Sequence, residues 1–101
     1  MISEPVGTVQ VVVTSDSVTI TLADEIDLTL DSELEDAART VRAHRLAVRV
    51  DATRVTFMDS AGARFIGRCY GHGPLTVEAS PTVRFLLEIL ALDDVLVSTE
   101  S

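Results

Sequence analysis

One serine stands in a setting that suits either nucleophilic chemistry or covalent modification. Ser60 follows Asp59 and precedes Ala61 and Gly62, where a loop is predicted to become a helix. A serine at such a position ordinarily caps the helix by accepting a backbone N–H, an interaction worth about 1 kcal/mol. The same position also tolerates a phosphoryl group, because the free N–H groups and the dipole of a helix N-terminus favour an anion. Small residues at Ala61, Gly62 and Ala63 are expected to leave the surrounding surface open to a docking partner.

Catalysis by Ser60 has little support in the sequence. The nucleophile elbow of α/β hydrolases needs glycine two residues before the serine, and this chain has Met58 there. The only candidate bases are His44, predicted at the end of a helix, and His72, in a glycine-flanked turn. We therefore predict no catalytic residue. A small hydrolase stays an alternative, which requires ester turnover that Ser60→Ala abolishes.

The sequence predicts neither a metal site nor a cofactor. The acidic residues Asp24, Glu25 and Asp27 lack the glycine and closing glutamate of a calcium loop. The single cysteine, Cys69, has no histidine at ligand spacing, and we expect it in the core with redox sensing as the alternative. One cysteine also excludes an intramolecular disulfide, which favours a reducing compartment.

Charge and length limit the kinds of partner. The 101 residues fit one domain, residues 1–101, with 98–101 expected as a loose tail. Eight Lys and Arg against sixteen Asp and Glu give a formal charge of −8, which disfavours nucleic acid and anionic lipid and favours a protein partner. The apolar run within residues 1–13 has no basic region before it, and no stretch is long enough to cross a bilayer, so we expect a cytoplasmic protein.

Strands and helices alternate in the predicted order of elements. Strands are expected at 9–13, 18–22, 46–50, 75–79 and 95–97. A first helix is expected with apolar residues from Leu30 to Val41 on one face, a second over about 61–70, and a third that begins at Pro81 and has an inner stripe as far as Leu90. Ser32 with Glu35 is expected to form a capping box, and Ser80 to cap a helix that begins with Pro81. Expected core positions on the three helices are Leu30, Leu34, Ala37, Ala38 and Val41, then Gly62, Phe65, Ile66 and Cys69, then Val83, Leu86, Leu87 and Leu90.

This order predicts an α/β fold. We expect a mixed, mainly parallel sheet of four to five strands, with an N-terminal hairpin and three helices packed on it. In such open sheets the functional surface lies at the carboxyl ends of the strands. Two predicted loops, 24–27 and 51–60, meet at that edge.

Several segments resemble STAS domains, specifically bacterial anti-sigma factor antagonists. Residues 57–62 (Phe-Met-Asp-Ser-Ala-Gly) resemble the Asp-Ser-x-Gly signature of that family. Residues 22–27 resemble its Leu-x-Gly-Glu-Leu-Asp segment, 46–51 its central strand, and 80–83 its Ser-Pro-x-Val helix opening. Four motifs in the family's order make the resemblance specific.

The resemblance implies a partner switch without catalysis by this chain. In that family the antagonist binds an anti-sigma serine kinase, the kinase phosphorylates the serine after the Asp, and a serine phosphatase resets it. Ser60 matches the phosphorylated serine. The partner-binding surface is then expected to include Glu25, Asp27, Asp59, Ser60, Ala61, Gly62 and Arg64.

Two departures and one alternative accompany this interpretation. Asp24 stands where the family usually has glycine, and Ala61 replaces a frequent second serine, which leaves Ser60 as the single candidate hydroxyl. The alternative is a constitutive STAS scaffold subunit of an ABC lipid transporter or stress-signalling complex, without regulation by phosphorylation. A monomer or weak dimer is expected in either case.

Overall fold

A four-stranded sheet carries its helices on one face. The computed structural model describes residues 6–96. Its elements are β1 (Thr8–Val13), β2 (Ser17–Ile26), the 3-10 helix η1 (Leu28–Leu30), α1 (Asp31–His44), β3 (Ala47–Met58), α2 (Ser60–Cys69), β4 (Leu75–Ala79), α3 (Pro81–Ile89) and the 3-10 helix η2 (Asp93–Val95).

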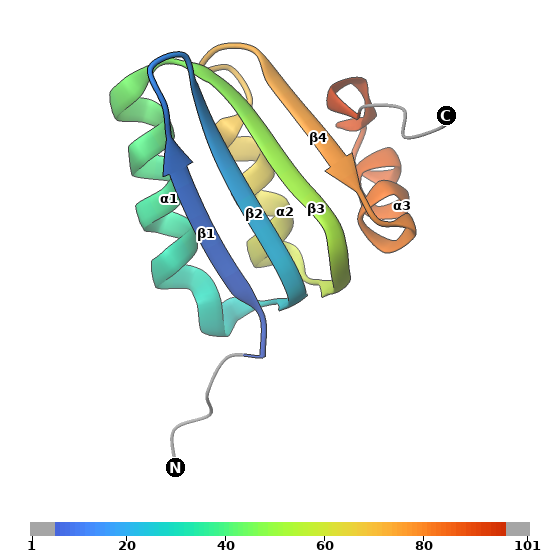
Figure 1. The fold of residues 1–101 in the computed structure, drawn as a ribbon. Coiled ribbons are helices and arrows are strands. Elements are labelled where there is room, and N and C mark those ends of the chain that lie inside the picture. The colour runs from blue at the N-terminus through green and yellow to red at the C-terminus, as the bar shows by residue number, and fades with distance from the viewer. Residues whose placement is uncertain (1–5, 97–101) are drawn as a thin grey trace.

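The strands lie in the order β1-β2-β3-β4. β1 pairs antiparallel with β2 through a turn in which Thr14 N–H donates to the Ser17 carbonyl at 2.9 Å. β3 pairs in parallel with β2, and β4 pairs in parallel with β3, as strand–helix–strand connections favour. Figure 1 shows α1 and α2 behind the sheet and α3 beside β4. The predicted α/β fold with its N-terminal hairpin is confirmed.

The core lies between the sheet and the helices. Val18, Ile20 and Leu22 alternate along β2 and are fully buried, as the predicted one-sided burial requires. The opposite sheet face is polar, with an ion pair between Arg49 and Glu78 at 3.2 Å. The predicted inner residues of α1 and α2 are all buried, namely Leu30, Leu34, Ala37, Ala38, Val41, Gly62, Phe65, Ile66 and Cys69.

Two predicted loops belong largely to strands. β2 and β3 stay paired up to Glu25 with Phe57 and Ile26 with Met58, beyond the predicted ends of both strands. Two register shifts in this stretch let the acidic segment bulge without leaving the sheet. Buried Ile26 and Met58 anchor the extension, so the carboxyl edge is more ordered than the sequence indicated.

The ends of three elements also differ from expectation. The Ser32–Glu35 capping box is absent from the described residues, because a 3-10 turn leads into α1 and Ser32 already lies inside its first turn. Leu90 ends α3 as its C-cap and is half exposed, so it leaves the inner stripe. In place of a strand at 95–97, η2 is followed by a single bridge from Leu96 to Val77. Residue 97 and the predicted tail lie outside the described residues.

Candidate functional site

Ser60 lies exposed at the start of α2, on the carboxyl edge of the sheet. The cap of this helix is Asp59, so the expectation that Ser60 is the N-cap is wrong. The side chain of Ser60 makes no hydrogen bond with any other residue in the range 6–96. Its hydroxyl is therefore free for a reaction or a contact with another molecule.

Asp59 joins three elements beneath this serine. One carboxylate oxygen, Oδ1, accepts from the Ala61 N–H at 2.8 Å and caps α2. The other, Oδ2, accepts from the Leu28 N–H at 3.2 Å, and the Asp59 N–H donates to the Ile26 carbonyl at 3.1 Å. These bonds fix the start of α2 against the end of β2 and the start of η1. Asp59 is half-buried and holds the edge in shape.

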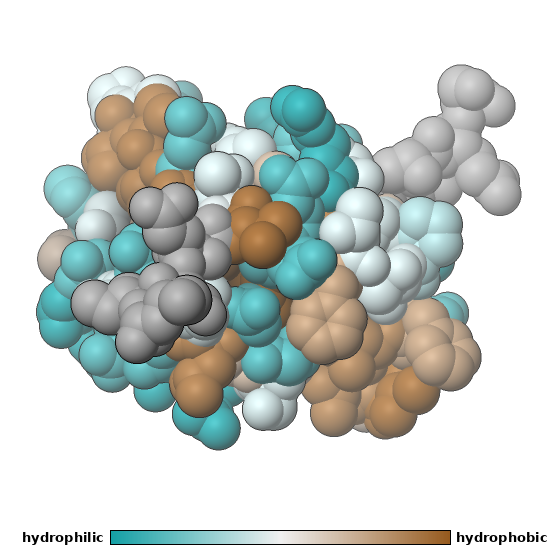
Figure 2. Space-filling model, turned by 90° about the horizontal axis from the view of Figure 1, so that it is seen from below, coloured by the Kyte–Doolittle hydropathy of each residue, from teal (hydrophilic) through white to brown (hydrophobic). Residues whose placement is uncertain are grey.

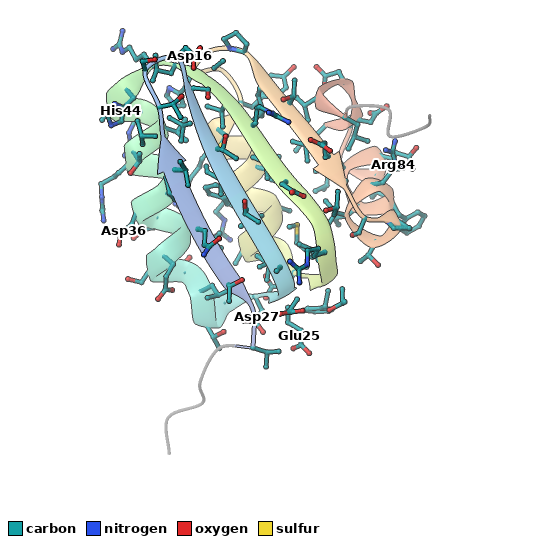
Figure 3. All side chains as sticks on the ribbon, viewed as in Figure 1. Asp16, Glu25, Asp27, Asp36, His44 and Arg84 are labelled. Carbon is teal, nitrogen blue, oxygen red and sulfur yellow. The ribbon has the colours of Figure 1, made fainter. Side chains whose placement is uncertain are left out.

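The acidic segment at the end of β2 takes a defined shape at the same edge as Ser60. Asp24 has φ of 65°, a left-handed conformation that Asp tolerates better than most residues, which accounts for Asp in place of the family's glycine. Asp27 caps η1 by accepting from the Thr29 N–H at 3.0 Å and from its hydroxyl. Glu25 is exposed. Figure 3 shows Glu25 and Asp27 together at the lower edge of the sheet.

A glycine before β1 allows the chain to pass close to this segment. A Cβ built on Gly7 lies 2.1 Å from the carbonyl oxygen of Glu25 and 2.9 Å from that of Ala23. Both neighbours are backbone atoms of a paired strand, which cannot move aside without disturbing the sheet. Gly7 thus fits β1 against the bulged end of β2.

The small residues after Ser60 pack inward. Ala61, Gly62 and Ala63 are buried, whereas we expected them to open the surface around the serine. A Cβ on Gly62 comes within 2.5 Å of the Met58 Cγ, so glycine permits the close approach of α2 to the sheet. The surface around Ser60 is supplied instead by the ends of β2 and β3 and by η1.

Arg64 lies one turn after Ser60 on α2, so their side chains are neighbours on the helix surface. It is exposed, and no ion pair involving it is present within residues 6–96. Arg68, a further turn along, pairs with Glu35 at 3.7 Å. Arg64 is thus a free cation beside an acidic edge.

Two exposed apolar side chains lie at the same carboxyl edge of the sheet as Ser60, and neither was among the predicted site residues. Leu28 on η1 is 68% exposed, and Phe57 at the end of β3 is 48% exposed. Figure 2 looks at this edge and shows apolar groups set among hydrophilic ones. Phe57 is exposed although Val55, two residues earlier on β3, and Met58, the next residue, are both buried, so alternation along this strand gave no signal of its orientation.

Neither of the two histidines lies near enough to Ser60 to act as its base. His72 follows the C-terminal end of α2, and the helix's ten residues separate it from Ser60 by about 15 Å. His44 ends α1 at the upper end of the molecule, away from Glu25 and Asp27 (Figure 3). The positions of the two histidines therefore give the hydrolase alternative no support.

Other reactive groups are absent from this edge or inert. No group of three His, Cys, Asp or Glu side chains within 6–96 is arranged to hold a metal ion. Cys69 is fully buried, and loss of solvation raises the pKa of its thiol to about 12, which suppresses the reactive thiolate and disfavours redox sensing. Among the described helices, none is long and apolar enough to cross a membrane.

A comparison with protein families finds one matching model. The model, described as "Mlab, STAS domain", matches residues 9–98. A search of curated proteins finds none that matches the sequence.

Solved structures share this fold over nearly the whole chain. An anti-sigma factor antagonist from Mycobacterium paratuberculosis is 25% identical, with a TM-score of 0.80 over 97% of this chain and 92% of that one. The antagonist SpoIIAA in its unphosphorylated form is 22% identical, with a TM-score of 0.75 over 92% and 90% of the two chains. The Bacillus cell fate determinant SpoIIAA in the phosphorylated form is 22% identical, with a TM-score of 0.73 over 92% and 93%.

Proposed function

The chain belongs to the STAS domain family, and we propose that it is an anti-sigma factor antagonist controlled by phosphorylation of Ser60. The unphosphorylated protein binds an anti-sigma serine kinase and so frees a sigma factor. The kinase phosphorylates Ser60 and is released, and a serine phosphatase restores the free hydroxyl. This chain acts by binding and leaves the catalysis to its partners. Such a switch operates in the cytoplasm.

The observation that carries the proposal is an exposed serine hydroxyl that has no hydrogen-bond partner among residues 6–96. Asp59 performs the capping that a serine at a helix start usually provides, so phosphorylation of Ser60 breaks no existing hydrogen bond. Because the Ser60 side chain makes no hydrogen bond that stabilises the described part of the fold, its phosphorylation changes the surface and leaves the fold intact. The exposed side chains of Leu28 and Phe57 at the same edge offer apolar contact area to a partner.

Electrostatics explain why the phosphate would end the contact. A phosphoserine adds a charge of about −1.5 to −2 at neutral pH. Glu25 and Asp59 already make this edge negative, so a partner suited to it presents cations and apolar groups at fixed positions. The phosphate adds bulk where these surfaces must meet, and it adds a negative charge beside Glu25 and Asp59 for which the partner's fixed cations are not positioned.

Two features would keep the phosphorylated protein folded. The first turn of α2 directs backbone N–H groups and the positive end of its dipole toward a phosphate on Ser60. Arg64, one turn along and without an internal ion pair, lies within reach of the same group. The phosphate then alters binding more than stability.

A phosphotransfer experiment tests the proposal. The protein is incubated with a purified anti-sigma serine kinase of the same organism and ATP, and the modified residue is mapped by mass spectrometry. One phosphate on Ser60 is expected. Ser60→Ala is expected to bind the kinase as the wild type does and to accept no phosphate. Phosphate transfer that persists in Ser60→Ala, or maps to another residue, contradicts the proposal.

A constitutive scaffold subunit is the second candidate, because the matching family model carries the name Mlab and not that of an antagonist. In that case the same edge packs permanently on an ATPase or signalling subunit. Stable co-purification with such a subunit, unchanged by Ser60→Asp, would favour the scaffold. Dissociation caused by Ser60→Asp favours the switch.

A further inference from the structure

α3 presents an apolar face that the fold does not use. Phe85 and Ile89 lie one helical turn apart and are 65% and 64% exposed. Phe57, at the end of β3, is 48% exposed. We call these three side chains the α3 patch. Large aromatic and branched residues gathered on one surface commonly mark an interaction site in a protein of this size.

The α3 patch shares an edge with Ser60. Phe57 precedes Ser60 by three residues, and both lie at the carboxyl end of the sheet. Figure 2, seen from that end, shows apolar groups extending from the region of β3 onto α3. A protein that covers Ser60 and Phe57 therefore meets the outer face of α3 in the same contact.

The charges around the α3 patch indicate what kind of protein binds it. Glu25 pairs in register with Phe57, and Glu88 precedes Ile89 on α3. Arg84 precedes Phe85 on the same helix but already has an interaction within the protein, so the acidic side chains are the charges left to meet a partner. A second copy of this chain brings the same acidic border and a further net charge of −8, which repels. A different protein, with an apolar surface bordered by Arg or Lys, matches both the apolar side chains of the patch and the acidic side chains around them.

We infer that the α3 patch is a second docking area for the protein that binds the Ser60 edge, which it contacts through an apolar surface bordered by cations. The inference rests on the proposed function for the identity of that protein, the anti-sigma serine kinase. The patch supplies affinity that does not depend on phosphate, while Ser60 supplies the switch. The two contributions are expected to be independent.

Calorimetric titration of the purified kinase tests this division. Phe85→Ser and Ile89→Ser are each expected to raise the Kd by about tenfold, the effect of losing one good apolar anchor. The matched control is Val12→Thr, which changes an exposed valine, 57% accessible, on the far strand β1. It is expected to leave the Kd unchanged. All three variants are expected to unfold as the wild type does, since the altered side chains are exposed.

Combination with Ser60→Asp separates this inference from the proposed function. If the losses of binding free energy in the single variants add up in the combined variants, both the patch and the switch are supported, because changes at independent sites are additive. If Phe85→Ser and Ile89→Ser weaken binding and Ser60→Asp does not, the patch stands and the switch is overturned. If only Ser60→Asp weakens binding, the patch is overturned and the switch stands. A dimer of the isolated protein that Ile89→Ser dissociates in sedimentation also overturns the inference, because the patch then serves self-association.

Discussion

Two serines stand at the starts of neighbouring helices and serve different purposes. Ser80 is the N-cap of α3: its hydroxyl accepts from the Val83 N–H at 3.4 Å, and the residue is 8% exposed. Ser60 is the first residue inside α2, exposed, with its capping role taken by Asp59. A shift of one residue relative to the cap separates a structural serine from an available one.

The preceding residue decides between these outcomes. Before Ser80 stands Ala79, which has no side-chain oxygen, so the cap of α3 comes from Ser80 itself. Before Ser60 stands Asp59, whose two carboxylate oxygens bind both α2 and η1. Because Asp59 caps α2, the hydroxyl of Ser60 is not needed for capping. This arrangement gives a physical reason for an Asp directly before the exposed serine.

The largest expected effect is on binding. Ser60→Asp places extra bulk and a charge without a matching cation where the partner must touch, and a charge buried unpaired in an interface costs several kcal/mol. The Kd for the anti-sigma serine kinase, measured by calorimetry, is expected to rise by at least about 30-fold. Ser15→Asp adds the same charge in the exposed hairpin turn and is expected to have little effect. Equal losses in both variants would mean that net charge, not position, controls binding.

Asp59→Ala tests whether Asp59 holds the edge together. The change removes the cap of α2 and the bond to the Leu28 N–H, and it is expected to lower the free energy of unfolding by about 2 kcal/mol. Urea denaturation measures the loss. Asp59→Asn keeps an oxygen for the Ala61 N–H and is expected to lose about half as much. A full loss in Asp59→Asn would show that charge matters more than capping here.

Asp24→Val tests the bent end of β2. A β-branched residue at a φ of 65° is expected to cost about 1–2 kcal/mol of stability, whereas Asp24→Gly relieves the constraint and is expected to be neutral or stabilising. Thermal unfolding compares the two variants. Equal midpoints for Val and Gly would show that Asp24 does not hold this conformation in solution.

The smallest effects compare the two serines directly. Ser80→Ala is expected to lower the free energy of unfolding by about 1 kcal/mol, because α3 loses its cap. Ser60→Ala removes no hydrogen bond within the described residues and is expected to stay within about 0.5 kcal/mol of the wild type. Urea denaturation of both variants provides the measurement. The comparison fails if Ser60→Ala is the less stable of the two.

Periodicity predicted most of the fold, because burial on one face leaves a regular record in the sequence. The buried face of β2 was predicted from the alternation of Val18, Ile20 and Leu22. The start of α3 was predicted from Ser80 and Pro81. At the other helix start, Asp59 and Ser60 are both good caps, and propensity alone does not choose between adjacent good caps.

The exposed edge was harder to foresee than the core. The bulges of β2 depend on pairing with β3, which sequence patterns do not reveal. Exposed Leu28 and Phe57 look like core residues by type, and only the fold shows that they face outward beside Ser60. Acidic residues were placed at this edge by strand order, but the capping roles of Asp27 and Asp59 required three-dimensional contacts.

The most direct test measures affinity before and after modification of the same protein. Wild-type protein is phosphorylated to completion, separated from the kinase, and titrated against fresh kinase without ATP, alongside untreated and phosphatase-treated samples. The account predicts tight binding by the untreated protein, a large loss after phosphorylation of Ser60, and full recovery after phosphatase treatment. Equal affinity of the phosphorylated and unphosphorylated forms would contradict it.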